Sequence, residues 1–547
     1  MLDCLRRFYN AHWQVVGKSH IGSMCAQVYH LNMRTLLNTL PIILITLTAC
    51  NIVRVEQLPE LPTATTVQSI SVTEVATVDR ALQRVPGTEG VANPSPEPCE
   101  FNTGQPTTQH IVDADVDYTQ RTVSARQTVH YINRTGMNLS QIVMVVEPNR
   151  WPNAFMLQRV TLGDDIQPLR YELTGRRLTI DLPQTLATEC TQSIELSFSI
   201  NVPPITDGLQ GLSGFFGASD RQLNLGHWLP VVAPYDTEGW GVREASAIGE
   251  QHVLDVADWN VTLNLTDMTN RLRLAAPGVR AQIDENTWNF IHNNARDFAV
   301  SMSDSFNRST RETSSGVMIE LFWFNNAVIE TEEGEIIDGA EHTLNMTARS
   351  LEMYEDLYGD YPFHNLVVVQ GDFPDGMELS GLFFVSDDWF VSYLGNPAAY
   401  LTLITIHEVA HQWWYGLVGN DAARHPWLDE AFATYSEFVF IEEHFPELKD
   451  WWWEFRVNRY SPDGFVDSSV YDFQSIRSYI NTVYLHGAQM LHTLRSDLGT
   501  DPFFEWLARY AEAGQDQLAT PDLLWSLLSD EQLELTQATR TNFLRNP

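Results

Sequence analysis

The stretch HEVAHQWWYG, residues 407 to 416, decides which fold and chemistry to expect from this chain. His407 and His411 are four residues apart, so on an α-helix they lie on one face. Two neutral imidazoles on one face can bind a zinc ion. Glu408 lies one residue further round, where its carboxylate can reach a water molecule at the metal and act as a general base. The alternative is an ordinary amphipathic helix with buried histidines.

A third ligand is expected, because a catalytic zinc ion usually has three protein ligands and one open position. The segment WLDEAFATYSEFVFIEEHF, residues 427 to 445, predicts a second long helix. Two glycines and a proline in GLVGNDAARHP, between the two helices, favour a turn back. Antiparallel helices would bring Glu430 against the histidines. Its neighbour Asp429 is the rival ligand, and it points about 100° away if Glu430 faces the metal.

The spacing of apolar residues changes along the chain. From about residue 100 to 310, short alternating segments such as RTVSARQTVHYI, QIVMVVE and SIELSFSI predict an all-β region, a sandwich or a saddle-shaped sheet. In the second half, the predicted strands VMIELFWF and YPFHNLVVVQGDF occur among helical segments such as AEHTLNMTARSLEMYEDLYG and AAYLTLITIHEVAHQWWYG. The remainder to Pro547 is mostly helical. The expected fold class is multidomain α+β.

The N-terminal segment indicates an exported, lipid-anchored protein. From Met33 the sequence MRTLLNTLPIILITLTAC has an arginine followed by an apolar stretch too short to span a bilayer. Its end, LTAC, resembles a bacterial lipobox, in which cleavage precedes Cys50 and the thiol is lipidated. A buried N-terminal helix is the alternative. We therefore expect a leader over residues 1–49 and localisation at the outer side of a bacterial cell membrane.

Residues 50–98 predict a flexible tether between the lipid and the folded body, because they contain LPELPTATT and NPSPEP. The net charge of −37 argues against nucleic-acid binding, which needs a basic face. The cysteines fit export: once Cys50 is modified and the leader removed, Cys99 and Cys190 remain and can form a disulfide. Two free thiols are the alternative.

The segment from His407 to Glu430 resembles the aminopeptidase N-like zinc metallopeptidases, gluzincins that include leukotriene hydrolase-type enzymes. The shared pattern is H-E-x-x-H, eighteen residues, then Glu. The resemblance implies one zinc ion per chain, bound by His407, His411 and Glu430, with Glu408 as general base. It also implies an N-terminal all-β sandwich or saddle domain, residues 99–310, followed by a thermolysin-like α/β zinc catalytic domain, residues 311–547.

Two further segments extend the resemblance to the substrate. FPDGMELSGL resembles the substrate-binding strand of the family, with Gly376 and Met377 before Glu378, whose carboxylate would bind a free α-amino group. VYLHGAQML resembles the segment of the catalytic tyrosine, so Tyr484 would stabilise the oxyanion of the reaction. The resemblance therefore implies an aminopeptidase that removes N-terminal residues from peptide substrates.

The sequence also departs from the family pattern. Leu379 replaces the asparagine after the glutamate, His486 replaces the lysine after the tyrosine, and WLDEA replaces WLNEG. In the region LNLGHWLPVVAPYDTEGW we cannot place the second amino-group anchor that the family has there. An endopeptidase of the same fold, with Glu378 only lining the cleft, is therefore the first alternative. A catalytically degenerate surface binding protein is the second.

Overall fold

The computed structural model describes residues 107–163, 167–205, 214–266 and 272–547. The predicted leader, the lipidation site Cys50, the tether and Cys99 lie outside the described residues. All the described residues belong to one compact unit. Within the described ranges, no helix combines the length and the apolar character needed to cross a membrane.

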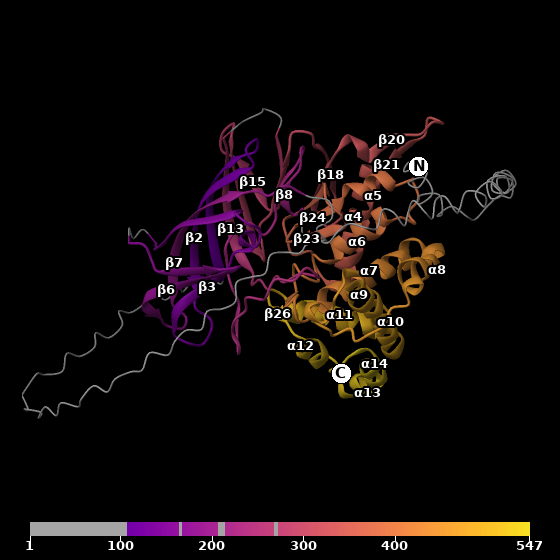
Figure 1. Ribbon diagram of the computed structural model, residues 1–547. Coiled ribbons are helices and arrows are strands. Elements are labelled where there is room, and N and C mark those ends of the chain that lie inside the picture. Colours follow the sequence, from indigo (N-terminus) through magenta and orange to yellow (C-terminus); the bar gives the residue numbers. More distant parts are fainter. Residues whose placement is uncertain (1–106, 164–166, 206–213, 267–271) are drawn as a thin grey trace, which may run out of the picture. The chain divides into compact units, whose positions relative to one another are not determined.

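The first half of the described chain consists of strands (Figure 1). Its largest sheet has the order β15-β16-β13-β1-β2-β7-β4. These strands are β1 (Thr108–Asp117), β2 (Thr122–Ile132), β4 (Phe155–Leu162), β7 (Thr191–Asn201), β13 (Ala257–Leu265), β15 (Val279–Gln282) and β16 (Thr287–Ala295). Strand β1 alternates as predicted, with Val112, Ala114 and Val116 buried and the residues between them exposed. One face of this sheet therefore contributes to the core.

Two four-stranded sheets and a two-stranded sheet, β11 (Tyr235–Asp236) with β12 (Gly239–Trp240), complete the β region. One four-stranded sheet contains β10 (Val231–Val232), β3 (Leu139–Val145), β6 (Arg177–Leu186) and β5 (Tyr171–Thr174); the other contains β14 (Arg273–Ala275), β17 (Val300–Ser303), β9 (Leu223–Leu225) and β8 (Phe216–Ala218). The prediction of a β-rich N-terminal region is confirmed. Cys190 is disulfide-bonded, and its partner lies outside the described residues, so the pairing with Cys99 stays a prediction.

A five-stranded sheet begins the second half, in the order β18-β19-β22-β24-β23. Its strands are β18 (Asn307–Glu312), β19 (Met318–Trp323), β22 (Asn365–Gly371), β23 (Gly376–Leu379) and β24 (Leu382–Ser386). All residues of β22 are buried, as expected for a strand with parallel neighbours on both sides. Strand β23 is antiparallel to β24 and forms one edge of this sheet.

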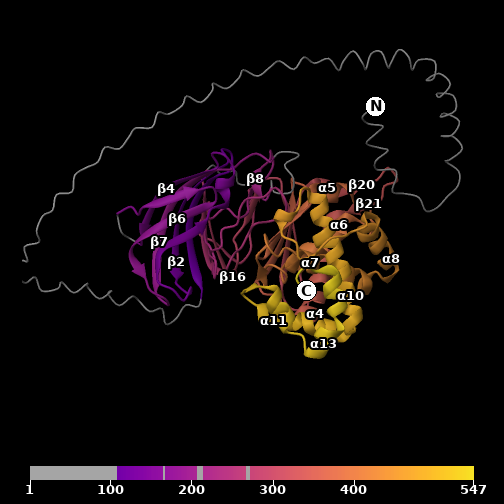
Figure 2. The same ribbon diagram turned by 60° about the horizontal axis from the view of Figure 1, so that its bottom comes forward.

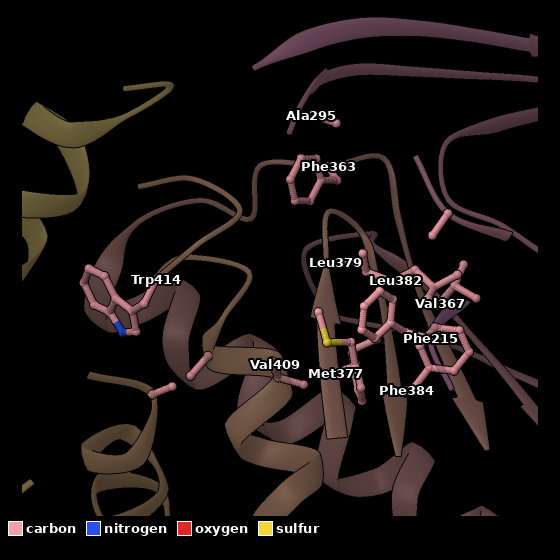
Figure 3. Packing of buried hydrophobic residues seen from close by; sticks show 14 of the residues in the cluster. Phe215, Ala295, Phe363, Val367, Met377, Leu379, Leu382, Phe384, Val409 and Trp414 are labelled. Atoms are coloured by element: carbon pink, nitrogen blue, oxygen red, sulfur yellow. The ribbon is translucent and has the colours of Figure 1, made fainter. Parts of the chain in front are cut away.

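Helices cover the rest of the chain, and the turned view in Figure 2 shows α6 and α7 beside each other as in Figure 1. They are α4 (Gly339–Tyr358), α5 (Asp387–Ser392), α6 (Tyr400–Ala410), α7 (Trp427–His444), α8 (Lys449–Trp452), α9 (Ile476–Tyr479), α10 (Gly487–Leu498), α11 (Thr500–Gly514), α12 (Pro521–Ser526), α13 (Asp530–Leu535) and α14 (Gln537–Phe543). Helix α6 packs against α4, α7 and β23. Figure 3 shows Val409 of α6 near Met377 of β23 in this apolar packing.

Helix α6 is shorter than the predicted segment, which continued to Gly416. The helix ends at Ala410, and the next turn widens because Gly416 N donates to His411 O at 2.8 Å and Val418 N donates to Trp413 O at 2.8 Å. These bonds span five residues instead of four. Apolar periodicity continues through the widened turn, because Trp413 and Trp414 are fully buried, and it therefore hides the end of the helix.

The buried guanidinium of Arg296, after β16, connects distant parts of the chain. Its Nε donates to Tyr415 O at 2.6 Å, and its Nη2 donates to Leu417 O at 3.0 Å and to Gln517 O at 2.8 Å. Its Nη1 donates to Leu254 O at 2.8 Å. The β-rich residues and the end of α6 are thus fixed by one side chain. Strand β18 spans the predicted domain boundary at residue 310, and this division of the chain stays a prediction.

Candidate metal centre and peptide cleft

Two histidines and a glutamate meet between α6 and α7. His407 Nε2 lies 3.1 Å from His411 Nε2 and 3.3 Å from Glu430 Oε2, and His411 Nε2 lies 3.4 Å from the same oxygen. All three side chains are buried. Glu430 is in the first turn of α7, so the turn between the helices brings it back onto the histidines. The rival Asp429 instead accepts a hydrogen bond from Glu430 N at 2.7 Å.

Acceptors behind the two imidazoles fix their orientation. His407 Nδ1 donates to Glu437 Oε1 at 2.9 Å, and His411 Nδ1 donates to Trp414 O at 2.9 Å. Glu437 is held in turn by Arg456, whose Nη2 donates to Glu437 Oε1 at 2.8 Å. Proteins commonly orient metal-binding histidines by such second partners.

This donor set fits a divalent cation such as zinc. With the Nδ1 protons donated away from the centre, the two Nε2 atoms face each other across 3.1 Å beside a carboxylate oxygen, where a cation could be bound by both nitrogens. Burial would lower the pKa of His407, but Glu430 and Glu437 outweigh this effect and raise that pKa to about 10. The centre therefore favours positive charge, which a cation bound by two imidazole nitrogens and one carboxylate supplies.

Glu408 faces the same centre from α6. Its Oε2 is buried without a hydrogen-bond partner among the described residues, and burial together with Glu430 and Glu250 raises its pKa. The carboxylate lies so close to Gly376 that a Cβ on that residue would be 2.1 Å from Glu408 Oε1. A side chain at position 376 would therefore displace the Glu408 carboxylate from the place that it has beside the strand.

Strand β23 presents alternate residues to the cleft. Gly376 and Glu378 line it, whereas Met377 points to the opposite side and packs in the core. Met377 thus supports the strand and does not line the cleft, although the sequence placed it with the substrate-binding residues. Burial, followed by the charge of Glu250, raises the pKa of Glu378 well above its usual range.

Glu250 is a cleft residue that sequence reasoning missed. It lies in the irregular segment 241–256, beyond the region in which we looked for a second anchor, and lines the cleft beside Glu378. The two carboxyl groups interact by hydrogen bonding and by charge repulsion. Two adjacent carboxylates at one end of a cleft favour a cationic group. The sequence of this segment, GVREASAIGEQHVLDV, has no periodicity that would have singled out Glu250.

Tyr484 reaches the centre from a π-helical segment, Ile480–His486. Its hydroxyl donates to Glu430 Oε1, and its ring is parallel to that of His407, with centroids 6.0 Å apart. His486 points elsewhere: its Nδ1 bonds to Gly464 O at 2.9 Å, and it does not line the cleft. Among these two residues, only Tyr484 can therefore contact a molecule at the centre.

One cavity of about 420 Å³ joins the metal centre to the other cleft residues; it is lined by His407, His411, Glu430, Glu408, Gly376, Glu378, Glu250 and Tyr484. Its lining also includes Asp375, Trp389, Tyr400, Arg456, Tyr460, Arg477 and Tyr479. A cavity of this size accommodates one or two amino-acid residues of an extended peptide. The edge strand β23 runs along it, where a peptide can add as a further strand.

In comparison with known proteins, the second half is similar to a peptidase family. Residues 342–542 match the model of the peptidase family M1 domain. Aminopeptidase N of Lactobacillus helveticus is 30% identical over 241 residues, which are 40% of this chain and 27% of that protein. Endoplasmic reticulum aminopeptidase 1 of Mus musculus is 29% identical over 237 residues, or 40% of this chain and 24% of that protein. The chain thus spans about a quarter of these curated relatives.

Solved structures are similar over more of the chain. An M1 zinc metallopeptidase from Deinococcus radiodurans aligns with a TM-score of 0.56 and 19% identity over 81% of this chain and 95% of that chain. A mutant of that peptidase, bound to a Tyr-Ser-Ala substrate, aligns with a TM-score of 0.55 and 18% identity, over 81% of this chain and 96% of that chain. These likenesses show a common fold. The resemblance to aminopeptidase N-like peptidases is confirmed by the family match and the curated relatives.

Proposed function

We propose that this chain is a zinc-dependent aminopeptidase, in which a β sandwich or saddle domain precedes a thermolysin-like catalytic domain. The observation that carries the proposal is the position of two carboxylates, Glu250 and Glu378, in the same cleft as the His407–His411–Glu430 centre. The centre suits hydrolysis, and the paired carboxylates suit the free ammonium at one end of a peptide. The family match over residues 342–542 includes the His407–His411–Glu430 centre and Glu378, and it supports their roles.

The residues of the cleft have different roles in the reaction. His407, His411 and Glu430 would hold the zinc ion, which when bound supplies Lewis acidity that polarises a carbonyl and eases deprotonation of water. Glu408 takes the proton from the attacking water and passes it to the leaving amine. Tyr484 donates its hydroxyl proton in a hydrogen bond to the negative charge that develops on the carbonyl oxygen.

The paired carboxylates would select the peptide bond. A peptide added to β23 has its ammonium at Glu250 and Glu378, while Gly376, two residues along the strand, lies against the general base Glu408. Since strand residues are about 3.3 Å apart, this arrangement brings the first peptide bond to the reacting centre. The alternative endopeptidase would need an extended peptide to continue past these two carboxylates without an ammonium to pair with them.

Tyr484→Phe is expected to keep zinc and fold but to lower kcat by about two to three decades, with KM little changed. The phenol donates to a charge that exists only after attack, so its loss affects the transition state and not substrate binding. Steady-state kinetics on an aminoacyl reporter and zinc analysis test this. Tyr435→Phe, which removes a buried hydroxyl bonded to His492 on the far side of α7, is the matched control. An unchanged kcat in Tyr484→Phe would remove this residue from the mechanism.

Comparing a short peptide with its N-acetylated twin tests exopeptidase action. We expect the free peptide to be cut one residue at a time from its N-terminus and the acetylated peptide to be spared. A charge-assisted hydrogen bond contributes about 1.5–3 kcal/mol, so Glu378→Ala should reduce the preference about tenfold to a hundredfold while zinc stays bound. Mass spectrometry of the products gives the order of cleavage.

Glu244→Gln is the control for this comparison, because Glu244 is an exposed carboxylate of the same segment as Glu250 and does not line the cleft. The preference of this variant for the free peptide over the N-acetylated peptide should equal that of the unmodified protein. Equal cleavage of both peptides at internal bonds would assign the chain to the endopeptidases instead.

We also propose that the protein is exported and anchored by a lipid on Cys50 at the outer side of a bacterial cell membrane. The support is the sequence LTAC after an apolar stretch. A labelled fatty acid should become attached to the expressed full chain and be absent from Cys50→Ser. Detection of the label in the variant, or its absence from the unmodified protein, would refute the anchor.

A further inference from the structure

The segment that carries Glu250 into the cleft has no regular secondary structure. Residues 241–256 run from β12 (Gly239–Trp240) to β13 without a helix or strand, yet Gln251 and His252 are buried. No ladder of backbone hydrogen bonds therefore fixes the position of Glu250. Side-chain contacts must do so.

The side chain of Gln251 bonds to the backbone of the turn that leads into Glu250. Its Nε2 donates to Gly249 O at 2.7 Å and to Ile248 O at 3.2 Å, and its Oε1 accepts from Ser246 N at 3.0 Å. Gly249 has φ of +60°, and a Cβ there would lie 2.7 Å from Val470 Cγ1. The backbone at Glu250 is thus placed, but the direction of its side chain is not set by these bonds.

His252 lies behind the Glu250 carboxylate, between two acidic groups. Its Nδ1 is 3.9 Å from Glu250 Oε2, and its Nε2 is 3.7 Å from Glu147 Oε2. These are ion-pair distances. Glu147 is itself held by Arg176, whose Nη1 donates to Glu147 Oε2 at 2.6 Å. The ring of His252 stacks on that of His227, with centroids 3.8 Å apart.

The surroundings of His252 favour its charged form. Burial would lower the pKa of His252, but Glu147 and Glu250 outweigh burial and raise it to about 9. An imidazolium therefore faces the rear of Glu250, at 3.9 Å from its Oε2. Attraction between these opposite charges favours one position of the carboxylate.

We propose that His252 is a positioning residue, which holds the Glu250 carboxylate in place to receive the α-ammonium of the substrate. Glu147 and Arg176 fix the imidazole from the side away from the cleft. His252 does not line the cleft and would act only through Glu250. The inference rests on the proposed aminopeptidase function, because it concerns the recognition of a free amino group.

Equilibrium binding separates this role from catalysis. The probes are L-leucinol, which has a free ammonium and no hydrolysable bond, and 4-methylpentan-1-ol, its twin without the amino group. Competition against a reporter or calorimetry on the zinc-loaded full chain gives their affinities. We expect the preference of His252→Gln for L-leucinol over 4-methylpentan-1-ol to be about tenfold smaller than that of the unmodified protein, a coupling of ordinary size for a buried charge pair. The affinity for 4-methylpentan-1-ol itself should be unchanged.

The controls separate positioning from a general effect on the fold. His110→Gln removes another buried, stacked imidazole, which lies on Trp259 and next to Gln127, and should leave the preference unchanged. His252→Lys keeps a cation and should restore most of the preference. If the Gln variant does not purify folded, Glu147→Gln removes the outer partner of His252 and is expected to lower the preference in the same direction.

A double variant decides whether His252 acts through Glu250. Glu250→Gln alone should abolish the preference for L-leucinol over 4-methylpentan-1-ol. Adding His252→Gln to this variant should then lower the preference no further. Additive losses, or an unchanged preference in His252→Gln, would overturn the inference. If the unmodified protein itself fails to distinguish L-leucinol from its twin, the proposed aminopeptidase function fails, and that result differs from one confined to the variants.

Discussion

Glu408→Gln is expected to retain one zinc ion per chain while its turnover falls by about two to four decades, the usual contribution of a general base. The reason lies in the geometry: Glu408 faces the centre from α6, but its Oε2 has no hydrogen-bond partner among the described residues. Glutamine has almost the same shape and cannot accept the proton of the attacking water. The two histidines of the proposed metal site, whose Nδ1 atoms donate to Glu437 and Trp414, should remain in place.

Single-turnover kinetics and zinc analysis on the same sample test this expectation. Glu443→Gln is a suitable control, because Glu443 is an exposed carboxylate on α7, the helix that carries Glu430. Ordinary turnover in Glu408→Gln would show that another group takes the proton. Loss of zinc from this variant would instead make Glu408 part of the metal site.

His411→Ala should lose zinc and activity together. Removing one of three ligands leaves two groups to hold the ion against water and chelators, and even loss of an outer partner typically costs about tenfold to a hundredfold in affinity. We therefore expect a loss of affinity greater than a hundredfold and turnover below about 1% of the unmodified protein. Zinc titration with a competing chelator gives the affinity.

The matched control is His444→Ala, which removes a histidine in the last turn of α7, remote from the ligands. It should bind zinc normally. If His411→Ala binds zinc as tightly as the unmodified protein, the ligand set is wrong. If it keeps zinc but loses activity, His411 serves the reaction without holding the metal.

Local spacing made the metal centre predictable. His407 and His411 are one turn apart on a helix, and Glu430 follows a glycine-containing turn, so sequence alone brings these three side chains together. The same holds for β22 within YPFHNLVVVQGDF, whose apolar run predicts a strand. In both cases the pattern is contained within a few turns or one strand of the chain.

Features set by distant contacts were not predictable. Glu250 lies in a segment without periodicity, and its position depends on Gln251 and His252. The end of α6 is hidden because the buried tryptophans after Ala410 continue the apolar pattern. Met377 points into the core because of the register in which β23 pairs with β24. The sequence of one strand alone does not specify this register.

Arg296 has a consequence for how the protein folds. Its guanidinium donates to carbonyl groups as far away in sequence as Gln517, a separation of 221 residues. A folding intermediate that had buried Arg296 without these acceptors would contain an uncompensated charge, which costs several kcal/mol. Such a species is disfavoured, so the guanidinium becomes buried only when Leu254, the residues after α6 and Gln517 are all in place. Closing contacts of this sequence separation also makes folding slow.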